Sequence, residues 1–469
     1  MSEGRQDGDD DADAPPPPAP PPAPGEQGAD SNFPGPRTLY YLTLLAVLAG
    51  VLAGFTGGAF RWVLVKTDAA RADLAQWALD HGPWGWLVTV LVSTAAAAAA
   101  TWIGTRWPMS AGSGIQQVEA VERGEDRAAP ASTIPARFIG GVLSIGVGGL
   151  VLGREGPTVH MGASFGALAG RLGRATRDEI RVLQSCLSGA GLAVAFNAPI
   201  GGAIFVFEEI SHKIRLRYLV WTIAAVVAAI SCSRVVLGNH PDFTVRAITE
   251  PAVANLPIFV VFGVFLGVLA VGYNVVIARL LSGLRSIRRI PAVAKGAAIG
   301  AVVGGGLVYV PDAVSGGDTV AQSMLDGRQL AFWTVAIYLV LRFFSGPLSY
   351  AAGTPGGLFA PMLALGTLCG VFFARVVEAA GVTVDTDTRI TLMIAGMSGL
   401  FAASVRAPFT GIVLVMEMCA ITTVSISMLA TAGAAVIVAA ALRSAPIYDT
   451  LREQMLAVEA ARRTRSGDG

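Results

Sequence analysis

Apolar stretches follow one another along almost the whole chain, separated by short polar or glycine- and proline-containing segments. From residue 38 onward they cover 38–65, 85–105, 135–153, 180–207, 218–237, 256–281, 292–310, 331–345, 356–378, 390–404 and 407–443. A helix needs about 20 apolar residues to cross a membrane. Several runs reach that length and others fall short of it. The pattern predicts an all-α polytopic membrane protein.

Glycine and proline interrupt the apolar runs at recurring places. The interruptions are Gly112–Gly114, Gly153–Pro157, Ala198-Pro199, Thr354–Gly357 and Ala407-Pro408. Non-helical backbone at membrane depth is tolerated only where protein or a water-filled cavity covers it. Broken helices of this kind are typical of transporters and channels.

Composition supports the membrane class. Of the 469 residues, 53% are hydrophobic and only 14% are charged, whereas soluble domains carry about 25% charged residues. The net charge of +1 gives no indication of nucleic-acid binding. The four cysteines and four histidines are scattered, so we expect no metal site and no cofactor.

The two ends of the chain differ from the apolar region between them. Residues 1–37 are acidic and rich in proline, and such sequence predicts a disordered tail. Residues 456–469 form a short polar tail. Basic residues cluster at 171–181, 213–217, 285–289 and 452–465, and the positive-inside rule therefore places both termini in the cytoplasm.

The halves of the sequence resemble each other. An offset of 200 residues superimposes several glycines, beginning with Gly153 and Gly353, and an offset of 209 superimposes Pro199 on Pro408 and Glu208 on Glu417. A weaker match at offset 202 pairs residues 113–114 with 315–316. Interrupted hydrophobic segments in corresponding halves indicate a binding site at the interface between repeats.

Glu155 is the most conspicuous acid in the apolar region. It lies in Gly153-Arg154-Glu155-Gly156-Pro157, and Pro157 suits the first turn of a helix. The N-terminus of a helix attracts anions, and an ionisable residue inside a membrane protein indicates function. The alternative for this motif alone is a glutamate in a surface loop. A phosphate-binding loop would require a Gly-Lys-Ser/Thr ending, which this motif lacks.

Four motifs in order resemble the CLC family of chloride channels and chloride/proton antiporters. They are Gly112-Ser113-Gly114-Ile115, Gly153–Pro157, Gly356-Gly357-Leu358-Phe359-Ala360-Pro361, and Tyr448 near the C-terminus. The resemblance covers roughly residues 38–455. It departs from the family at Gln116, where many members have proline.

The resemblance implies a chloride site and its gate. Ser113 and Tyr448 correspond to the hydroxyl donors of the central anion site, and the backbone N–H groups around Gly156, Leu358 and Phe359 to its other donors. Glu155 corresponds to the gating glutamate. Its carboxylate occupies an anion position when ionised and leaves when protonated. A serine at position 113 implies chloride rather than nitrate as the preferred anion.

A second glutamate separates the two mechanisms of the family. Glu209 matches the internal proton-transfer glutamate of the antiporters, a position at which passive channels usually lack an acid. Glu208 has a repeat partner in Glu417, so we expect it to be structural. Taken alone, the Glu208-Glu209 pair could also be a solvated helix end.

The resemblance further implies a CLC-like inverted repeat of broken and tilted helices, with repeats at 38–245 and 246–455, the second ending in a helix that lines the pore. It implies a homodimer in the lipid bilayer of the cell membrane, with one pathway per subunit that exchanges chloride for protons.

One alternative is a passive voltage- or pH-gated chloride channel of the same fold. A remote alternative is an intramembrane serine hydrolase using Ser113 with a base such as His160, which requires both side chains to meet.

Overall fold

The computed structural model describes residues 36–213 and 216–466, and this part of the chain contains helices and two isolated bridges but no strand. The first half forms α1 (Pro36–Asp80), α2 (Gly82–Arg106), α3 (Ile115–Glu122), α4 (Thr133–Gly141), α5 (Glu155–Leu172), α6 (Arg177–Phe196), α7 (Pro199–Phe205) and α8 (Leu216–Leu237). Two π-helical segments, η2 (Val142–Val147) and η3 (Val206–Ile210), continue α4 and α7.

The second half supplies a matching series of helices. It forms α9 (Leu256–Ser286), α10 (Ala292–Tyr309), α11 (Asp318–Leu325), α12 (Phe332–Ala351), α13 (Phe359–Ala379), α14 (Thr386–Val405), α15 (Pro408–Cys419), α16 (Ser425–Ala441) and α17 (Ile447–Ser466). Three short 3₁₀ turns are η1 (Pro108–Ser110), η4 (Val253–Asn255) and η5 (Pro311–Ala313). The prediction of an all-helical chain of broken helices is confirmed.

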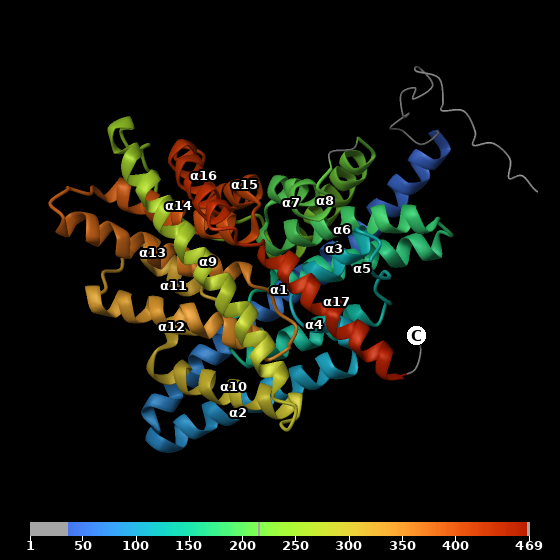
Figure 1. Cartoon of the computed structure of the whole chain (residues 1–469), viewed down its shortest axis with the longest axis horizontal. Coiled ribbons are helices and arrows are strands. Elements are labelled where there is room, and N and C mark those ends of the chain that lie inside the picture. The colour runs from blue at the N-terminus through green and yellow to red at the C-terminus, as the bar shows by residue number, and fades with distance from the viewer. Residues whose placement is uncertain (1–35, 214–215, 467–469) are drawn as a thin grey trace, which may run out of the picture.

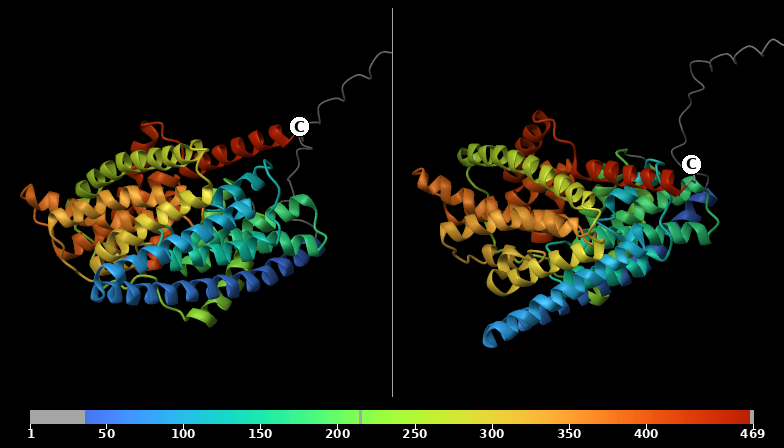
Figure 2. Two further views of the ribbon diagram at one scale, coloured as in Figure 1. Left: turned by 90° about the horizontal axis from the view of Figure 1, so that it is seen from below. Right: turned by 60° about the horizontal axis from the view of Figure 1, so that its bottom comes forward.

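The two halves lie side by side and meet along several helices. In Figure 1 the helices of the first half occupy the right of the molecule and those of the second half the left, while α2 and α10 pack together at the bottom. The two further views in Figure 2 show that α17 runs over one outer face toward the first half, where it contacts α3.

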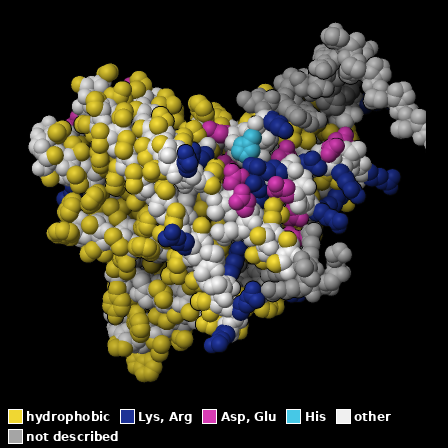
Figure 3. Space-filling view, in the orientation of Figure 1, with side chains coloured by type: hydrophobic (Ala, Val, Ile, Leu, Met, Phe, Trp, Pro, Cys, Tyr) yellow, Lys and Arg dark blue, Asp and Glu magenta, His cyan; other side chains and the backbone are white. Residues whose placement is uncertain are grey.

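Length and composition fit a membrane protein. Eight helices in the described ranges are long and apolar enough to cross a bilayer. Figure 3 shows hydrophobic side chains covering the left and lower parts of one face, over the second half and α2. Acidic and basic side chains gather on the right of that face, over α3 and α17.

Small residues allow corresponding helix pairs to approach closely in both halves. On α1, Gly54 lies against the backbone of α8 at Ala229, and on α9, Gly267 lies against the backbone of α16 at Ala435. Helices inside membranes often associate through such small residues because backbones can then touch. The crossing of α1 over α8 is therefore repeated by α9 over α16.

The structure corrects the predicted register of the repeat in two places. Helices α3 and α11 each follow a left-handed glycine, Gly114 and Gly317, so the offset is 203 rather than 202. In α5 and α13, Gly166 packs against Leu183 of α6 and Gly370 against Leu392 of α14. That equivalence gives an offset of 204 rather than 200.

The offset of 209 agrees with the helix caps around α6 and α14. The side chains of Thr176 and Asp385 cap the starts of these helices, and Asn197 and Arg406 end them in the left-handed conformation. The apolar run predicted at 180–207 is consequently two helices, because the chain turns sharply at Asn197. Likewise the run at 407–443 breaks at Ala420, another residue with positive φ.

At the ends of the chain, most of the predicted 1–37 tail lies outside the described residues. Residues 456–466 of the predicted polar tail are helical, as the last part of α17.

Candidate anion and proton sites

The three glycine motifs meet at the start of α5 and α13. The N–H of Gly112 donates to the carbonyl of Thr354 (3.1 Å), and the N–H of Gly356 donates back to the carbonyl of Gly112 (3.2 Å). Gly153 and Gly357 exchange a pair of backbone hydrogen bonds of 2.9 and 2.8 Å. Segments more than 200 residues apart in sequence therefore form one site, as the resemblance implied.

Glu155 is the first residue of α5, and its side chain is fully buried. Its Oε1 accepts the backbone N–H of Phe359, the first residue of α13, at 2.7 Å, while Oε2 has no partner among the described residues. A Cβ added to Gly357 would stand only 2.7 Å from the carboxyl carbon. The carboxylate thus lies where two helix N-termini attract negative charge, and a surface loop is ruled out.

Ser113 lies beside the same site, in the turn before α3. A Cβ added to Gly156 would stand 2.8 Å from the Ser113 Oγ, so the serine is close to the start of α5. The hydroxyl is buried and has no hydrogen-bond partner among the described residues. Buried hydroxyls normally have a partner, so this one is available to a ligand.

Tyr448, in the first turn of α17, supplies a second hydroxyl of this kind. Its side chain is fully buried, and its OH has no hydrogen-bond partner in the described parts of the chain. The ring centre lies 5.9 Å from that of Phe359, the residue whose N–H donates to Glu155. Leu358, which is fully buried, caps the N-terminus of α13.

Two residues that the sequence did not single out hold the Ser113 turn. Arg137, fully buried on α4, donates from Nη1 to the Ser113 carbonyl (2.9 Å) and from Nη2 to the Met109 carbonyl (3.0 Å). The Tyr350 hydroxyl accepts the Ser113 N–H (3.3 Å) and the Gln116 side chain (3.1 Å). For Arg137, the signal available in the sequence was a basic residue within the apolar run 135–153.

On the other side of Glu155, Arg154 faces a group of ion pairs. Its guanidinium donates to Asp242 (2.7 Å) and Asp318 (3.1 Å), and Asp242 also pairs with Arg61. Asp242 is nearly buried whereas Asp318 is half exposed. These carboxylates partly balance the positive charge of Arg154.

Glu208 and Glu209 lie on the π-helical segment η3 but have different surroundings. The Glu208 carboxylate accepts the backbone N–H groups of Phe409 (3.1 Å) and Thr410 (2.6 Å), at the start of α15. It is structural, as the repeat predicted. Glu209 caps no helix among the described residues, is only 5% exposed, and lies on η3, which packs against α3. Glu209 is therefore not a solvent-exposed acid at a helix end.

The geometry disfavours the hydrolase alternative. His160 is buried on α5 with its Cβ close to Gly114, yet neither its Nδ1 nor the Ser113 Oγ has a hydrogen-bond partner in the part of the chain described. A nucleophilic serine requires a base within hydrogen-bond reach, and Ser113 lacks that contact with His160.

Comparisons with known proteins identify the family of the chain. The model of the voltage-gated chloride channel family matches residues 95–440. The chain is 34% identical to the H(+)/Cl(-) exchange transporter ClcA of Vibrio parahaemolyticus over 434 residues, which cover 89% of this chain and 91% of the relative. It is also 34% identical to the ClcA of Cronobacter sakazakii, with 92% and 94% covered.

A solved structure matches at the level of the fold and of the sequence. The crystal structure of a slow cyanobacterial Cl⁻/H⁺ antiporter superimposes with a TM-score of 0.81 at 31% sequence identity, covering 91% of this chain and 99% of the other. Because the family model and the relatives each cover most of its length, the chain belongs to the voltage-gated chloride channel (CLC) family of multi-pass membrane proteins.

Proposed function

We propose that this protein exchanges chloride for protons across the cell membrane. The relatives named as H(+)/Cl(-) exchangers and the cyanobacterial antiporter support this activity. The observation that carries the proposal is the position of the Glu155 carboxylate, which accepts the Phe359 N–H at the paired N-termini of α5 and α13. A carboxylate there competes with chloride for the same donors.

The competition links the two ions. While ionised, Glu155 occupies the anion position and blocks the pathway. Protonation removes the negative charge, the side chain leaves the donors of α5 and α13, and chloride takes its place beside the Ser113 and Tyr448 hydroxyls. The backbone N–H groups of Gly156, Leu358 and Phe359 complete the set of neutral donors. Neutral donors bind an anion weakly enough for it to leave again.

Glu209 is the second proton-carrying group in this proposal. Glu209 is buried and caps no helix, so its carboxylate is free to gain and lose a proton. Protons pass between Glu209 and Glu155 along α7, whereas chloride passes Ser113 and Tyr448. The proton route and the chloride route share only the part of the pathway at Glu155. No cofactor takes part, and the transported species are chloride and protons.

We further propose that the protein is a homodimer with one pathway in each subunit and with both termini in the cytoplasm. The clusters of basic residues at 171–181 and 285–289 support this orientation, because positive residues are retained on the cytoplasmic side. Cross-linking in native membranes tests the dimer, and labelling of single cysteines on either side tests the orientation.

The deciding experiment measures chloride efflux from proteoliposomes together with external pH. A chloride gradient should drive protons uphill, at a fixed ratio to chloride. A passive voltage- or pH-gated channel, the second candidate, would release chloride without moving protons against their gradient. The two outcomes are mutually exclusive for the same preparation.

A further inference from the structure

Glu209 is separated from solvent by a compact group of charged side chains on α3 and α17. Glu119 of α3 is 2% exposed, and its Oε1 accepts hydrogen bonds from Arg123 (2.6 Å) and from Arg452 of α17. Asp449 of α17 also pairs with both arginines, at 3.0 and 2.8 Å. Two arginines therefore direct N–H groups at the same oxygen of Glu119.

The second oxygen of Glu119 is free. Its Oε2 is buried without a hydrogen-bond partner in the described ranges, and α3, which carries Glu119, packs against η3, which carries Glu209. A carboxylate near Glu209 attracts a proton that passes between that acid and the surface. Glu119 cannot itself collect a proton from water, because the side chains of Glu119 and Glu209 are both nearly buried.

His212 connects this buried pair to the outside. Its side chain is 48% exposed, and its Nε2 lies 3.8 Å from Glu119 Oε1. The same Nε2 lies 3.4 Å from Nη2 of Arg123. Since arginine can only donate, Nε2 accepts this hydrogen bond in the neutral ring that carries its proton on Nδ1. A proton on Nε2 ends that interaction.

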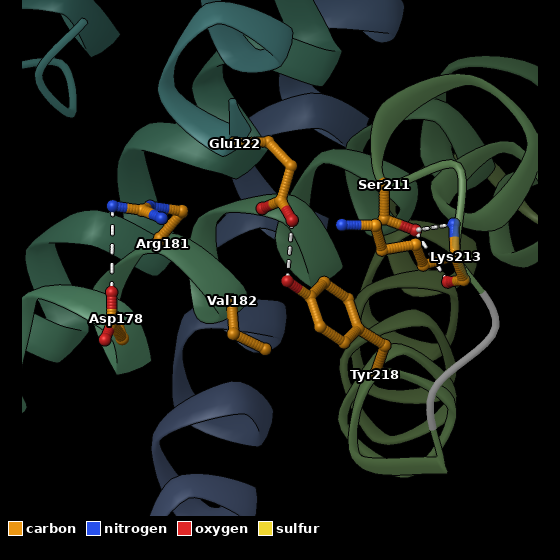
Figure 4. Close-up of a pocket in the computed structure, with 7 residues that line it drawn as sticks. All are labelled: Glu122, Asp178, Arg181, Val182, Ser211, Lys213 and Tyr218. Carbon is orange, nitrogen blue, oxygen red and sulfur yellow. Dashed lines mark hydrogen bonds and ion pairs between the residues drawn. The ribbon is translucent and has the colours of Figure 1, made fainter. Parts of the chain in front are cut away.

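Water-accessible space borders the same segment. A polar cavity of about 300 Å³ is lined by Ser211 and Lys213, the neighbours of His212 in sequence, and by Glu122, Asp178, Arg181, Val182 and Tyr218. Figure 4 shows Ser211 and Lys213 on one side of this cavity, facing Glu122 and Tyr218. His212 therefore belongs to a segment that is in contact with solvent.

We propose that His212 collects protons at the face that carries α3 and α17 and delivers them to Glu209, with the nearby Glu119 carboxylate attracting the proton as it passes. In this step a proton leaves hydronium or a buffer acid, binds Nε2 of His212, and passes to a carboxylate oxygen of Glu209, after which the ring is neutral again. The proposal rests on the exchange function above and adds the residue at which protons enter.

The test uses His212→Asn and His212→Gln in proteoliposomes. His212 has a positive φ of 49°, a conformation that asparagine tolerates well, so the first variant preserves the turn. His240→Asn is the matched control at another exposed histidine. We expect both His212 variants to pump protons roughly tenfold more slowly, with an unchanged proton-to-chloride ratio, and the control to match the parent.

Imidazole distinguishes proton delivery from a structural effect. Added on the α17 side, it should restore pumping in the His212 variants and leave the parent unchanged, because a mobile imidazole replaces the missing ring. Pumping at the parental rate in both variants would overturn the proposal, and so would slow pumping that imidazole fails to restore. If the parent itself pumps no protons, the exchange function fails, which is a separate result.

Discussion

Glu208 and Glu417 cap each other's helices. The Glu208 carboxylate accepts two first-turn N–H groups of α15, at 2.6 and 3.1 Å, and the Glu417 carboxylate accepts two first-turn N–H groups of α7, at 2.7 and 3.0 Å. Each acid thus satisfies backbone donors that begin the helix carrying the other. The exchange ties the two repeats together one residue away from Glu209.

Removing either cap should destabilise the fold without stopping transport. We expect Glu208→Ala and Glu417→Ala each to lower the free energy of unfolding by about 1–2 kcal/mol, because two N–H groups lose their acceptor. Thermal unfolding in detergent measures the loss, and Glu209→Gln, which removes no cap, is the control. Loss of proton coupling in Glu208→Ala at normal stability would assign Glu208 a transport role.

Replacing Glu155 by Gln should separate chloride movement from protons. The neutral side chain cannot gain or lose a proton, so chloride flux persists but no longer drives protons. In the parent, lowering the pH protonates Glu155, opens the pathway and raises chloride flux, and this rise should disappear in the variant. Parallel recordings of chloride and pH over a pH series test both effects. Continued uphill proton transport in Glu155→Gln would refute the gating role.

Tyr448→Phe removes one hydroxyl and keeps the ring beside Phe359. We expect weaker chloride binding by isothermal titration calorimetry and looser coupling, because an emptier central site lets the two ions pass independently. The loss of one hydrogen bond to a charged group is worth about 1.5–3 kcal/mol, or roughly a 10- to 150-fold change in Kd. Tyr448→Ala should show a larger loss of coupling. Chloride affinity equal to that of the parent in both variants would remove Tyr448 from the site.

Glu209→Gln keeps the side-chain volume and hydrogen-bonding capacity but cannot ionise. Proton flux should collapse while chloride still moves, more slowly and passively, with a normal melting temperature. The matched variant is Glu208→Gln, one residue away on the same π-helical segment. If Glu209→Gln pumps as well as a pumping parent, Glu209 carries no protons and Glu208 becomes the next candidate.

The 209-residue repeat predicted the structural role of Glu208, and the family resemblance predicted that the glycine motifs lie together. The register of α5 and α13 was wrong by four residues. Glycines recur every fourth position there, as at Gly166 and Gly170, so a slip of one helical turn still superimposes glycines. Only the packing against α6 and α14 distinguishes the two registers.

Other parts of the site could not be predicted, because they depend on contacts between distant segments. Arg137 reads in the sequence as one basic residue in an apolar run, yet it satisfies the carbonyl groups of the turn that carries Ser113. The pairing of Arg154 with Asp242 joins segments 88 residues apart. No spacing in the sequence predicts such ion pairs, because the two partners do not recur at a fixed interval along the chain.

The close crossings of α5 with α6 and of α13 with α14 limit how this protein can move. A methyl group at Gly166 would stand 2.6 Å from a carbonyl oxygen of α6, and one at Gly370 would stand 2.5 Å from a carbonyl oxygen of α14. Backbones in such contact behave as one rigid block, so the helices that present the Glu155 site have little freedom to rock against their neighbours. If Glu155 gates the pathway as proposed, its side chain therefore rotates within a rigid frame of helices, and opening requires no large displacement of α5 or α13.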